Sequence, residues 1–350
     1  MRGPSRREML ASAVWGTAAI AVGVRGTAAH ADPAPPARGR AAGTTTRGHA
    51  RDMNTRGQAR DMTSHGQARD MTTRGHARDM NTRGQARDMS TRGQVGDMST
   101  RRRVGDMSTA QWEAFVRAVR ALKARGTYDA LVKTYADDFM DTHANGFFLP
   151  WQRRYLLDFE RELRRVDPAV SVPYWDWTLD GRAPERSAVL SKAYFGGNGS
   201  ATHDQAVLDG AFAGWTATVP RMHPLRRSYA DGERIPAWAS TGLIANMLKN
   251  PDFQLFNMQL EIHIGAVQMG IGGDLAQPAA PNDPLYWAVA CFGDLLWHMW
   301  RCRHPKARVR SAYGNVTEES RLPRYGDTVA AVLDIEKLGY RYDGGWPRTR

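Results

Sequence analysis

Apolar positions recur at helical spacing through the C-terminal part of the chain. In the first such segment Phe115 and Val119 mark one face, and this spacing is typical of an amphipathic helix. Ser108, followed three residues later by Gln111, predicts a capping box at its N-terminus. Glycine-, proline- and tryptophan-rich stretches separate the segments, so we predict a mainly α fold over residues 110–350, a helix bundle in a loop-rich shell. The predicted helices are residues 111–125, 151–165, 253–264 and 285–303.

A nine-residue unit repeats seven times ahead of this domain, from Arg47–Thr55 to Arg101–Thr109. A Pro-, Ala- and Arg-rich linker over residues 32–46 precedes the array. Each copy carries one methionine and one alanine or valine among polar residues, so it buries too little apolar surface to offset the entropy of ordering. We therefore predict that residues 47–109 form a disordered repeat tail.

The last copy continues without a break into the first predicted helix. The array therefore resembles repeated copies of the segment with which the domain begins. One interpretation is replication slippage that left a tolerated spacer. The other is a basic arm that touches an anionic wall or a partner. The sequence leaves both open.

The N-terminus has the pattern of a twin-arginine export signal. Arg6 and Arg7 precede a modestly apolar stretch over residues 9–24, and residues 29–31 form a small-residue cleavage pattern. The stretch has fewer strongly apolar residues than the roughly 20 that a membrane span needs. We predict a signal peptide over residues 1–31, export to the cell envelope or the medium, and no stable membrane span.

The basic character of the chain belongs to its tail. The net charge is +12 over 350 residues; residues 1–109 carry 19 basic and 9 acidic side chains, and residues 110–350 carry 29 and 27. The domain is therefore nearly neutral, at +2, and offers no large basic face by count. We predict that nucleic acid is not a partner.

Motifs in four parts of the domain resemble those of tyrosinases, in the same order. The resemblance spans residues 104–343. It implies a tyrosinase-like four-helix bundle and an oxidoreductase activity on monophenols or o-diphenols. The first copper motif and the segment after it are resembled by Phe147–Glu160 and Val172–Thr178. The second copper motif is resembled by Pro281–Trp287, Asp294–Trp297 and Arg303–Pro305, and the closing segment by Val332–Asp343.

The resemblance also implies two copper ions, each held by three histidines, because imidazole is a neutral nitrogen donor near pH 7 that suits copper. Only His143 and His263 stand at these positions. An amide oxygen is a poor copper donor, alanine has none, and a tyrosine must lose a proton with a pKa of about 10. We therefore predict that copper, the family cofactor, binds weakly or not at all. The substituted positions are Tyr135, Gln152, Gln259 and Ala290.

Motif residues that support the fold, among them Pro150 and Trp151, are retained although most ligands are gone. We therefore predict a pseudoenzyme or a repurposed phenol-binding protein, with a phenolic small molecule or another protein as its partner. Two alternatives stay open: a phenol or catechol oxidoreductase with an unusual ligand set, and a metal-free enzyme acting on a phenolic metabolite. Candidate pocket residues are Glu261, Cys291 and Asp294.

The two histidines, Cys291 and the aromatic residues of the motifs each have more than one possible role. His143 and His263 could share one metal with Glu261, His203 or His223, or they are leftover histidines that bond to neighbours, since a metal site normally needs three or more ligands. Cys291 could act as a nucleophile, although buried thiols are usually inert. Aromatic residues of the motifs line a phenol pocket or fill the core. These aromatics are Trp151, Trp175, Trp177, Tyr286, Trp287 and Trp297.

Overall fold

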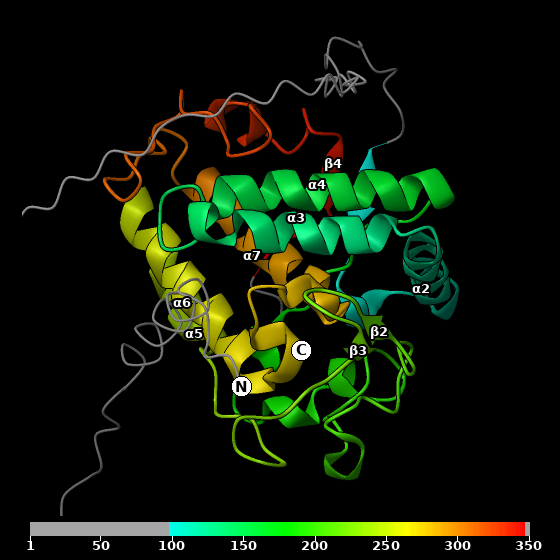
Figure 1. Ribbon diagram of the computed structural model, residues 1–350. Helices are drawn as coiled ribbons and strands as arrows, with labels where there is room; N and C mark the ends of the chain where they lie inside the picture. The colour runs from blue at the N-terminus through cyan, green and yellow to red at the C-terminus, as the bar shows by residue number, and fades with distance from the viewer. Residues whose placement is uncertain (1–97, 347–350) are drawn as a thin grey trace, which may run out of the picture. The chain divides into compact units, whose positions relative to one another are not determined.

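The structure, a computed structural model, describes residues 98–346. It confirms a mainly α, tyrosinase-like fold in which helices form the centre and irregular segments surround them (Figure 1). Strand β1 (Ser99–Arg101) pairs in parallel with β4 (Tyr340–Tyr342), and β2 (Thr216–Ala217) pairs antiparallel with β3 (His223–Pro224). The helices are α2 (Thr109–Ala124), α3 (Thr127–Thr142), α4 (Phe148–Val166), α5 (Thr241–Met247), α6 (Phe253–Ile271) and α7 (Leu285–Arg303).

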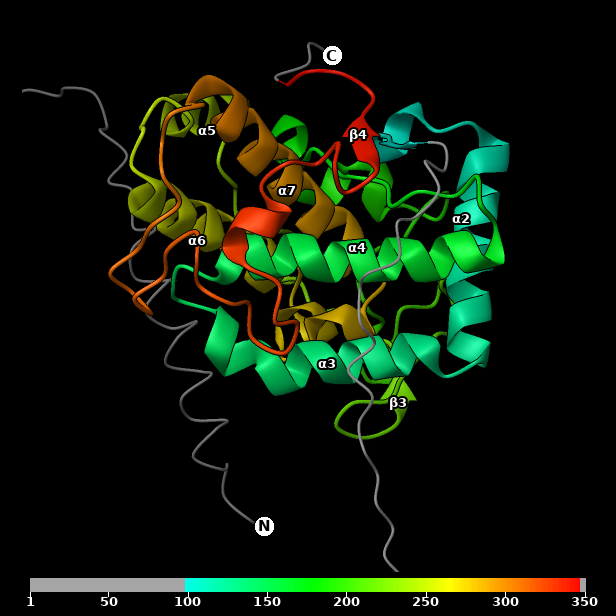
Figure 2. The same ribbon diagram turned by 90° about the horizontal axis from the view of Figure 1, so that it is seen from above.

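Helix α4 lies at the centre and packs against α2, α3, α6 and α7. Figure 1 and Figure 2 show α3 and α4 side by side, with α2 at one end of the pair and α6 at the other. Every residue of α7 from Leu285 to Trp297 is buried, as expected for a helix that is apolar on all sides. The rings of Phe159 and Trp287 stack with their centroids 3.7 Å apart, which joins α4 to α7.

The pattern of apolar residues missed two helices, and two other helices are longer in the structure than predicted. Helix α3 buries Tyr128, Val132 and Phe139, but acidic and polar residues between them obscure the spacing. Gly126 joins α2 directly to α3 with φ of 73°, a backbone angle that glycine adopts readily. Helix α5 was also missed, α4 begins three residues before the predicted start, and α6 continues to Ile271.

The predicted boundary between tail and domain at residue 110 is wrong for the last residues of the array. Residues 98–109 contain β1 and the 3-10 turn Val104–Asp106, and they pack on the domain. Ser108 accepts a hydrogen bond from the Gln111 amide, so the predicted capping box is present. The predicted signal, the linker and residues 47–97 of the array lie outside the described residues.

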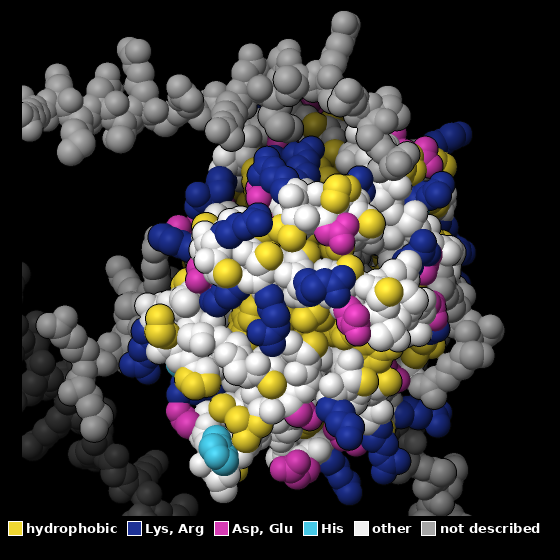
Figure 3. All heavy atoms as spheres, turned by 90° about the vertical axis from the view of Figure 1, so that its right-hand side faces the viewer, with side chains coloured by type: hydrophobic (Ala, Val, Ile, Leu, Met, Phe, Trp, Pro, Cys, Tyr) yellow, Lys and Arg dark blue, Asp and Glu magenta, His cyan; other side chains and the backbone are white. Residues whose placement is uncertain are grey.

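The surface at the α2 end of the bundle is mixed in character. Figure 3 shows Lys and Arg side chains spread over this face, between hydrophobic areas and acidic side chains. Within residues 98–346, every helix is too short or too polar to cross a membrane.

A buried cluster of charges, which we name the Asp294 clamp, ties α4, α7, β1 and β4 together. Arg101 of β1 lies 2.7 Å from Glu160 of α4 and 3.1 Å from Asp294 of α7. Arg153 of α4 lies 2.5 Å from the other oxygen of Asp294. All four side chains are at most 3% exposed, so each charge depends on the others, because an unpaired charge is costly to bury.

Two tyrosines of β4 complete the Asp294 clamp. The hydroxyls of Tyr340 and Tyr342 donate hydrogen bonds to Asp294 at 2.7 and 2.6 Å. The Arg101 guanidinium also lies 3.6 Å from the centroid of the Tyr340 ring. The clamp therefore consists of Arg101, Arg153, Glu160, Asp294, Tyr340 and Tyr342.

We expect Asp294→Asn to destabilise the chain by about 3–5 kcal/mol near pH 7, because two buried guanidiniums lose their shared counter-charge. Burial raises the pKa of Asp294, but the charges of Arg153 and Arg101 outweigh burial and hold the pKa below its usual value. The wild type therefore keeps this stabilisation above about pH 4 and loses it as the pH falls through the folded-state pKa.

Urea unfolding of both proteins at neutral and acidic pH measures this difference. Asp137→Asn is the control, since Asp137 pairs with Lys133 at the surface and such pairs contribute at most about 1 kcal/mol. A gap between wild type and Asp294→Asn that stays constant down to pH 3 would contradict the charge pairing.

Candidate functional site

The first part of the candidate site is a contact between Tyr135 of α3 and His143, the residue that follows α3. The Tyr135 hydroxyl lies 2.9 Å from His143 Nε2, and His143 Nδ1 lies 2.9 Å from the carbonyl oxygen of Phe139. A carbonyl only accepts hydrogen bonds, so Nδ1 carries the hydrogen and the Nε2 lone pair accepts the tyrosine hydroxyl. Burial lowers the pKa of His143 to about 4, so the ring is neutral at pH 7 and both nitrogens have partners.

Gln152 of α4 stands at the second substituted position, and its amide is partly unsatisfied. Its Nε2 donates to the Tyr286 hydroxyl at 3.3 Å, while its Oε1 has no hydrogen-bond partner within the described residues. A Cβ built on Gly293 would lie 3.7 Å from this oxygen and 2.7 Å from Ile264 Cδ1. The Ile264 side chain therefore fills the space between α6 and α7 beside Gln152. Ala290 is 1% exposed and brings only a methyl group.

Helix α6 does not present its two predicted positions to the interior equally. Its buried positions include Leu260 and Ile264, whereas Gln259 is exposed and His263 is partly buried. The structure thus does not bring Gln259 to the buried side of α6, because the large apolar side chains take that side. Burial lowers the pKa of His263.

Glu261 connects α6 to the turn that carries His143. Its carboxylate accepts a hydrogen bond of 2.8 Å from the backbone amide of Ala144, a residue with φ of 54°. Burial raises the pKa of Glu261 to about 8, although the Ala144 amide opposes this rise. Burial is the main cause that raises the pKa of Tyr135, and the neighbouring charges of Tyr286 and Glu261 raise it further.

These residues do not fit a pair of copper ions. Nε2 of His143 is occupied by Tyr135, Ala290 has no donor atom, and Gln259 lies at the surface. Across residues 98–346, no group of three or more His, Cys, Asp or Glu side chains is placed to hold a metal. His203 is exposed and lies beside Ser200 and Thr202.

Cys291 and Asp294, the other predicted pocket residues, are parts of the core. Asp294 belongs to the Asp294 clamp. The Cys291 sulfur lies 3.7 Å from the Val172 carbonyl oxygen, and burial raises the pKa of this thiol to about 12. A protonated, buried thiol is a poor nucleophile. The motif aromatics are at most 2% exposed and fill the core: Trp151, Trp175, Trp177, Tyr286, Trp287 and Trp297.

A pocket of about 570 Å³, which we name the α3 pocket, opens on the other side of Phe139. Ala136, Phe139 and Met140 of α3 form one wall, and loop residues between 219 and 226 and between 273 and 282 form the rest. The Phe139 ring stacks on the His143 ring with centroids 4.0 Å apart. The pocket and the surroundings of His143 therefore have Phe139 in common.

A histidine–carboxylate pair lies in the wall of the α3 pocket. His223 Nε2 is 2.7 Å from Asp274, and His223 Nδ1 is 2.8 Å from the carbonyl oxygen of Arg221. Both partners are oxygen atoms that accept hydrogen bonds, so each nitrogen of the imidazole faces an acceptor. Burial raises the pKa of Asp274. Apart from His223, no residue of this pocket was predicted from the sequence, because loops that are distant in sequence form it.

Comparison with known proteins agrees with the motifs. A profile described as the common central domain of tyrosinase matches residues 115–303. The chain is 34% identical over 259 residues to the tyrosinase of Streptomyces glaucescens, which covers 65% of this chain and 93% of that protein. It is 31% identical over 249 residues to grixazone synthase of Streptomyces griseus, covering 55% of this chain and 80% of that protein.

Solved structures share the fold. A variant polyphenol oxidase from Thermothelomyces thermophila superposes with a TM-score of 0.59 at 20% identity, over 70% of this chain and 88% of that chain. Tyrosinase from Burkholderia thailandensis superposes with a TM-score of 0.51 at 16% identity, over 71% and 74% of the two chains. Ordered motifs, helical core and profile match agree, and the chain belongs to the tyrosinase family.

Proposed function

We propose that this member of an oxidoreductase family has lost the dicopper chemistry of the family and binds a phenol-sized aromatic molecule. The observation that carries the proposal is the hydrogen bond between Tyr135 and His143. A residue at one ligand position occupies the lone pair of a residue at another, so neither is free to hold a metal. Ala290 and the exposed Gln259 supply nothing in their place.

The α3 pocket supports the choice of ligand. Its volume of about 570 Å³ lies in the range of roughly 300–1,000 Å³ of small-molecule sites. Phe139 and Met140 offer an apolar wall for an aromatic ring, and the His223–Asp274 pair offers polar atoms for a hydroxyl group. A protein partner at this pocket remains a second form of the same proposal.

A metal-free enzyme is the second candidate, and the His223–Asp274 pair favours it. A histidine that is hydrogen-bonded to a carboxyl group beside a pocket is suited to general acid–base catalysis on a bound phenol. An oxidase with an unusual ligand set is the third, and the similarity to a tyrosinase and to grixazone synthase favours it. Copper content separates the third candidate from the others, and turnover of a phenol separates the second from the first.

The proposal includes export by the twin-arginine route. It rests on residues 1–31 of the sequence alone. Since this route carries folded cargo, the domain would cross the membrane with its helical core already formed.

We expect the full chain, reconstituted with Cu(II) and desalted, to retain far fewer than two copper ions and to consume no oxygen with catechol. Metal analysis and an oxygen electrode measure both. The matched variant restores histidine at four positions, Tyr135→His, Gln152→His, Gln259→His and Ala290→His, and we expect it to retain more copper. Two tightly held coppers per wild-type chain would overturn the loss of the dicopper centre, whatever the variant does.

We expect 4-nitrocatechol to bind the full chain and Ala136→Phe to weaken binding at least 10-fold, because the new ring occupies the α3 pocket. The shift of the ligand's absorbance on titration measures the affinity. Ala130→Phe is the control, since Ala130 is an exposed residue of the same helix. Equal affinity of both variants and the wild type would place any binding site elsewhere.

A further inference from the structure

The end of the repeat array docks on the domain through a small set of side chains. Ser99 Oγ donates to Glu160 at 3.2 Å, and the Arg101 guanidinium contacts both Glu160 and Asp294. Val104 is fully buried, and its backbone amide donates to the carbonyl oxygen of Tyr174 at 2.8 Å. These contacts are made by the segment Ser99–Met107.

Backbone atoms provide the remaining contacts, and these do not depend on side-chain identity. The Ser99 amide donates to the Gly339 carbonyl oxygen at 3.0 Å, and the Thr100 carbonyl oxygen accepts from Ser171 Oγ at 2.7 Å. We name the receiving surface the repeat socket. It consists of Glu160, Ser171, Tyr174, Asp294, Gly339, Tyr340 and Tyr342.

Counted in the register of the docked segment Ser99–Met107, the sixth copy of the repeat is Ser90–Met98, and it carries the same docking side chains nine residues earlier. Ser90–Met98 is identical to Ser99–Met107 at seven of nine positions, including the serine, the arginine and the valine. The two differences are glycine for Arg102 and glutamine for Arg103. Arg102 contributes its carbonyl oxygen, which accepts from the Tyr174 amide at 2.8 Å, and the Arg103 side chain only pairs with Asp106 at the surface.

The earlier copies match the repeat socket less well. The first five have alanine where Val104 is buried, and arginine where Gly105 stands. A Cβ on Gly105 would meet nothing within 4 Å, so the arginine is accommodated, but the alanine buries less apolar surface. The third copy also has His65 in place of the docking arginine. The sixth copy is therefore the best alternative occupant.

We propose that the repeat socket is a binding site for the nonapeptide repeat, and that the sixth copy, Ser90–Met98, seats in it in exchange for the seventh. The exchange moves nine residues, Ser99–Met107, into a loop. Ser108 stays with α2, so the capping box is kept. Closing a loop of nine residues lowers the population of this state by roughly 30-fold.

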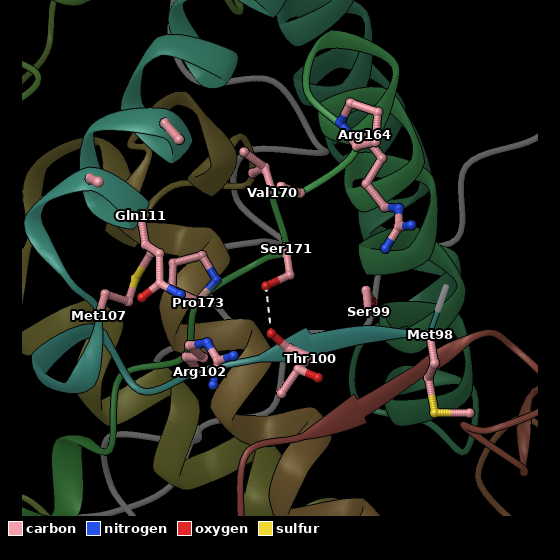
Figure 4. A pocket seen from close by; sticks show the side chains of 14 residues that line it. Met98, Ser99, Thr100, Arg102, Met107, Gln111, Arg164, Val170, Ser171 and Pro173 are labelled. Atoms are coloured by element: carbon pink, nitrogen blue, oxygen red, sulfur yellow. Dashed lines mark hydrogen bonds between the residues drawn. The ribbon is translucent and has the colours of Figure 1, made fainter. Parts of the chain in front are cut away.

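The structure leaves one side of the docked segment open. A groove of about 760 Å³ runs beside β1, between the start of α2 and residues 168–173 (Figure 4). Met98, Ser99, Thr100 and Arg102 line it, whereas Arg101 and Val104 are fully buried. The exchange therefore replaces the buried arginine and valine of one copy by those of the other.

The same chain supplies the occupant more readily than a second chain. The sixth copy is adjacent in sequence to the seventh, so its effective concentration at the repeat socket is on the order of millimolar. A repeat from another molecule competes at its bulk concentration. The exchange is accordingly intramolecular.

A cycle of variants in the full chain tests the proposal. We expect Arg92→Ala to leave the thermal midpoint unchanged and Arg101→Ala to lower it by a few degrees. Arg92→Ala and Arg101→Ala together should lower it by more than the sum, because neither copy then supplies the arginine. Arg87→Ala in the Arg101→Ala background is the charge-matched control and should add nothing. A double variant equal to Arg101→Ala, or a lone Arg101→Ala that does not fold, would overturn the proposal.

Cross-linking in the Arg101→Ala chain locates the occupant directly. Thr91 takes the place of Thr100 beside Ser171 after the exchange, so Thr91→Cys and Ser171→Cys should join through a short bismaleimide. Cys302 is exposed and is replaced by serine in these variants. Peptide mapping that shows a link between positions 91 and 171 within one chain supports the proposal. A cross-linked dimer, or no such link, overturns it.

Discussion

The fold depends on the sharing of one buried carboxylate by two buried arginines. Asp294 in α7 lies between Arg153 of α4 and Arg101 of β1, and the cost of leaving either guanidinium unpaired in the interior far exceeds that of a surface pair. This constraint explains why residues 98–109 are part of the domain although their composition is that of a tail. Because Arg101 is buried beside Asp294, strand β1, which carries it, packs on the domain.

The same rule, that a buried polar group needs a partner, governs the candidate site. A buried imidazole needs a partner for its lone pair, and the Tyr135 hydroxyl is that partner for His143. The Gln152 amide is less fully hydrogen-bonded, since its Oε1 has no partner within the described residues. The hydrogen bond at α3 and the Ile264 side chain at α6 therefore support the proposal that this region no longer holds a dicopper centre.

The sequence predicted the elements whose energetics are local. The predicted helix 285–303 coincides with α7, because a long apolar segment is visible in the sequence alone. The capping box at Ser108 could be predicted because it joins residues that are close in sequence. The sequence could not predict that Gln259 faces outward or that the α3 pocket exists. Both follow from competition between side chains that are distant in sequence, and the burial of Arg101 depends on Asp294, which lies 193 positions away.

The docking of the last copy on the domain bears on the interpretation of the whole repeat array. A spacer that arose by slippage is free to lose its arginine and its serine, because nothing holds them. In this chain the copy nearest the domain other than the docked one keeps every docking side chain, while the more distant copies have alanine in place of valine. The match therefore changes in one step, between the sixth copy and the five before it. Because loop closure is least costly for the adjacent copy, this step favours a role for the sixth copy at the repeat socket over a spacer defined by its length alone.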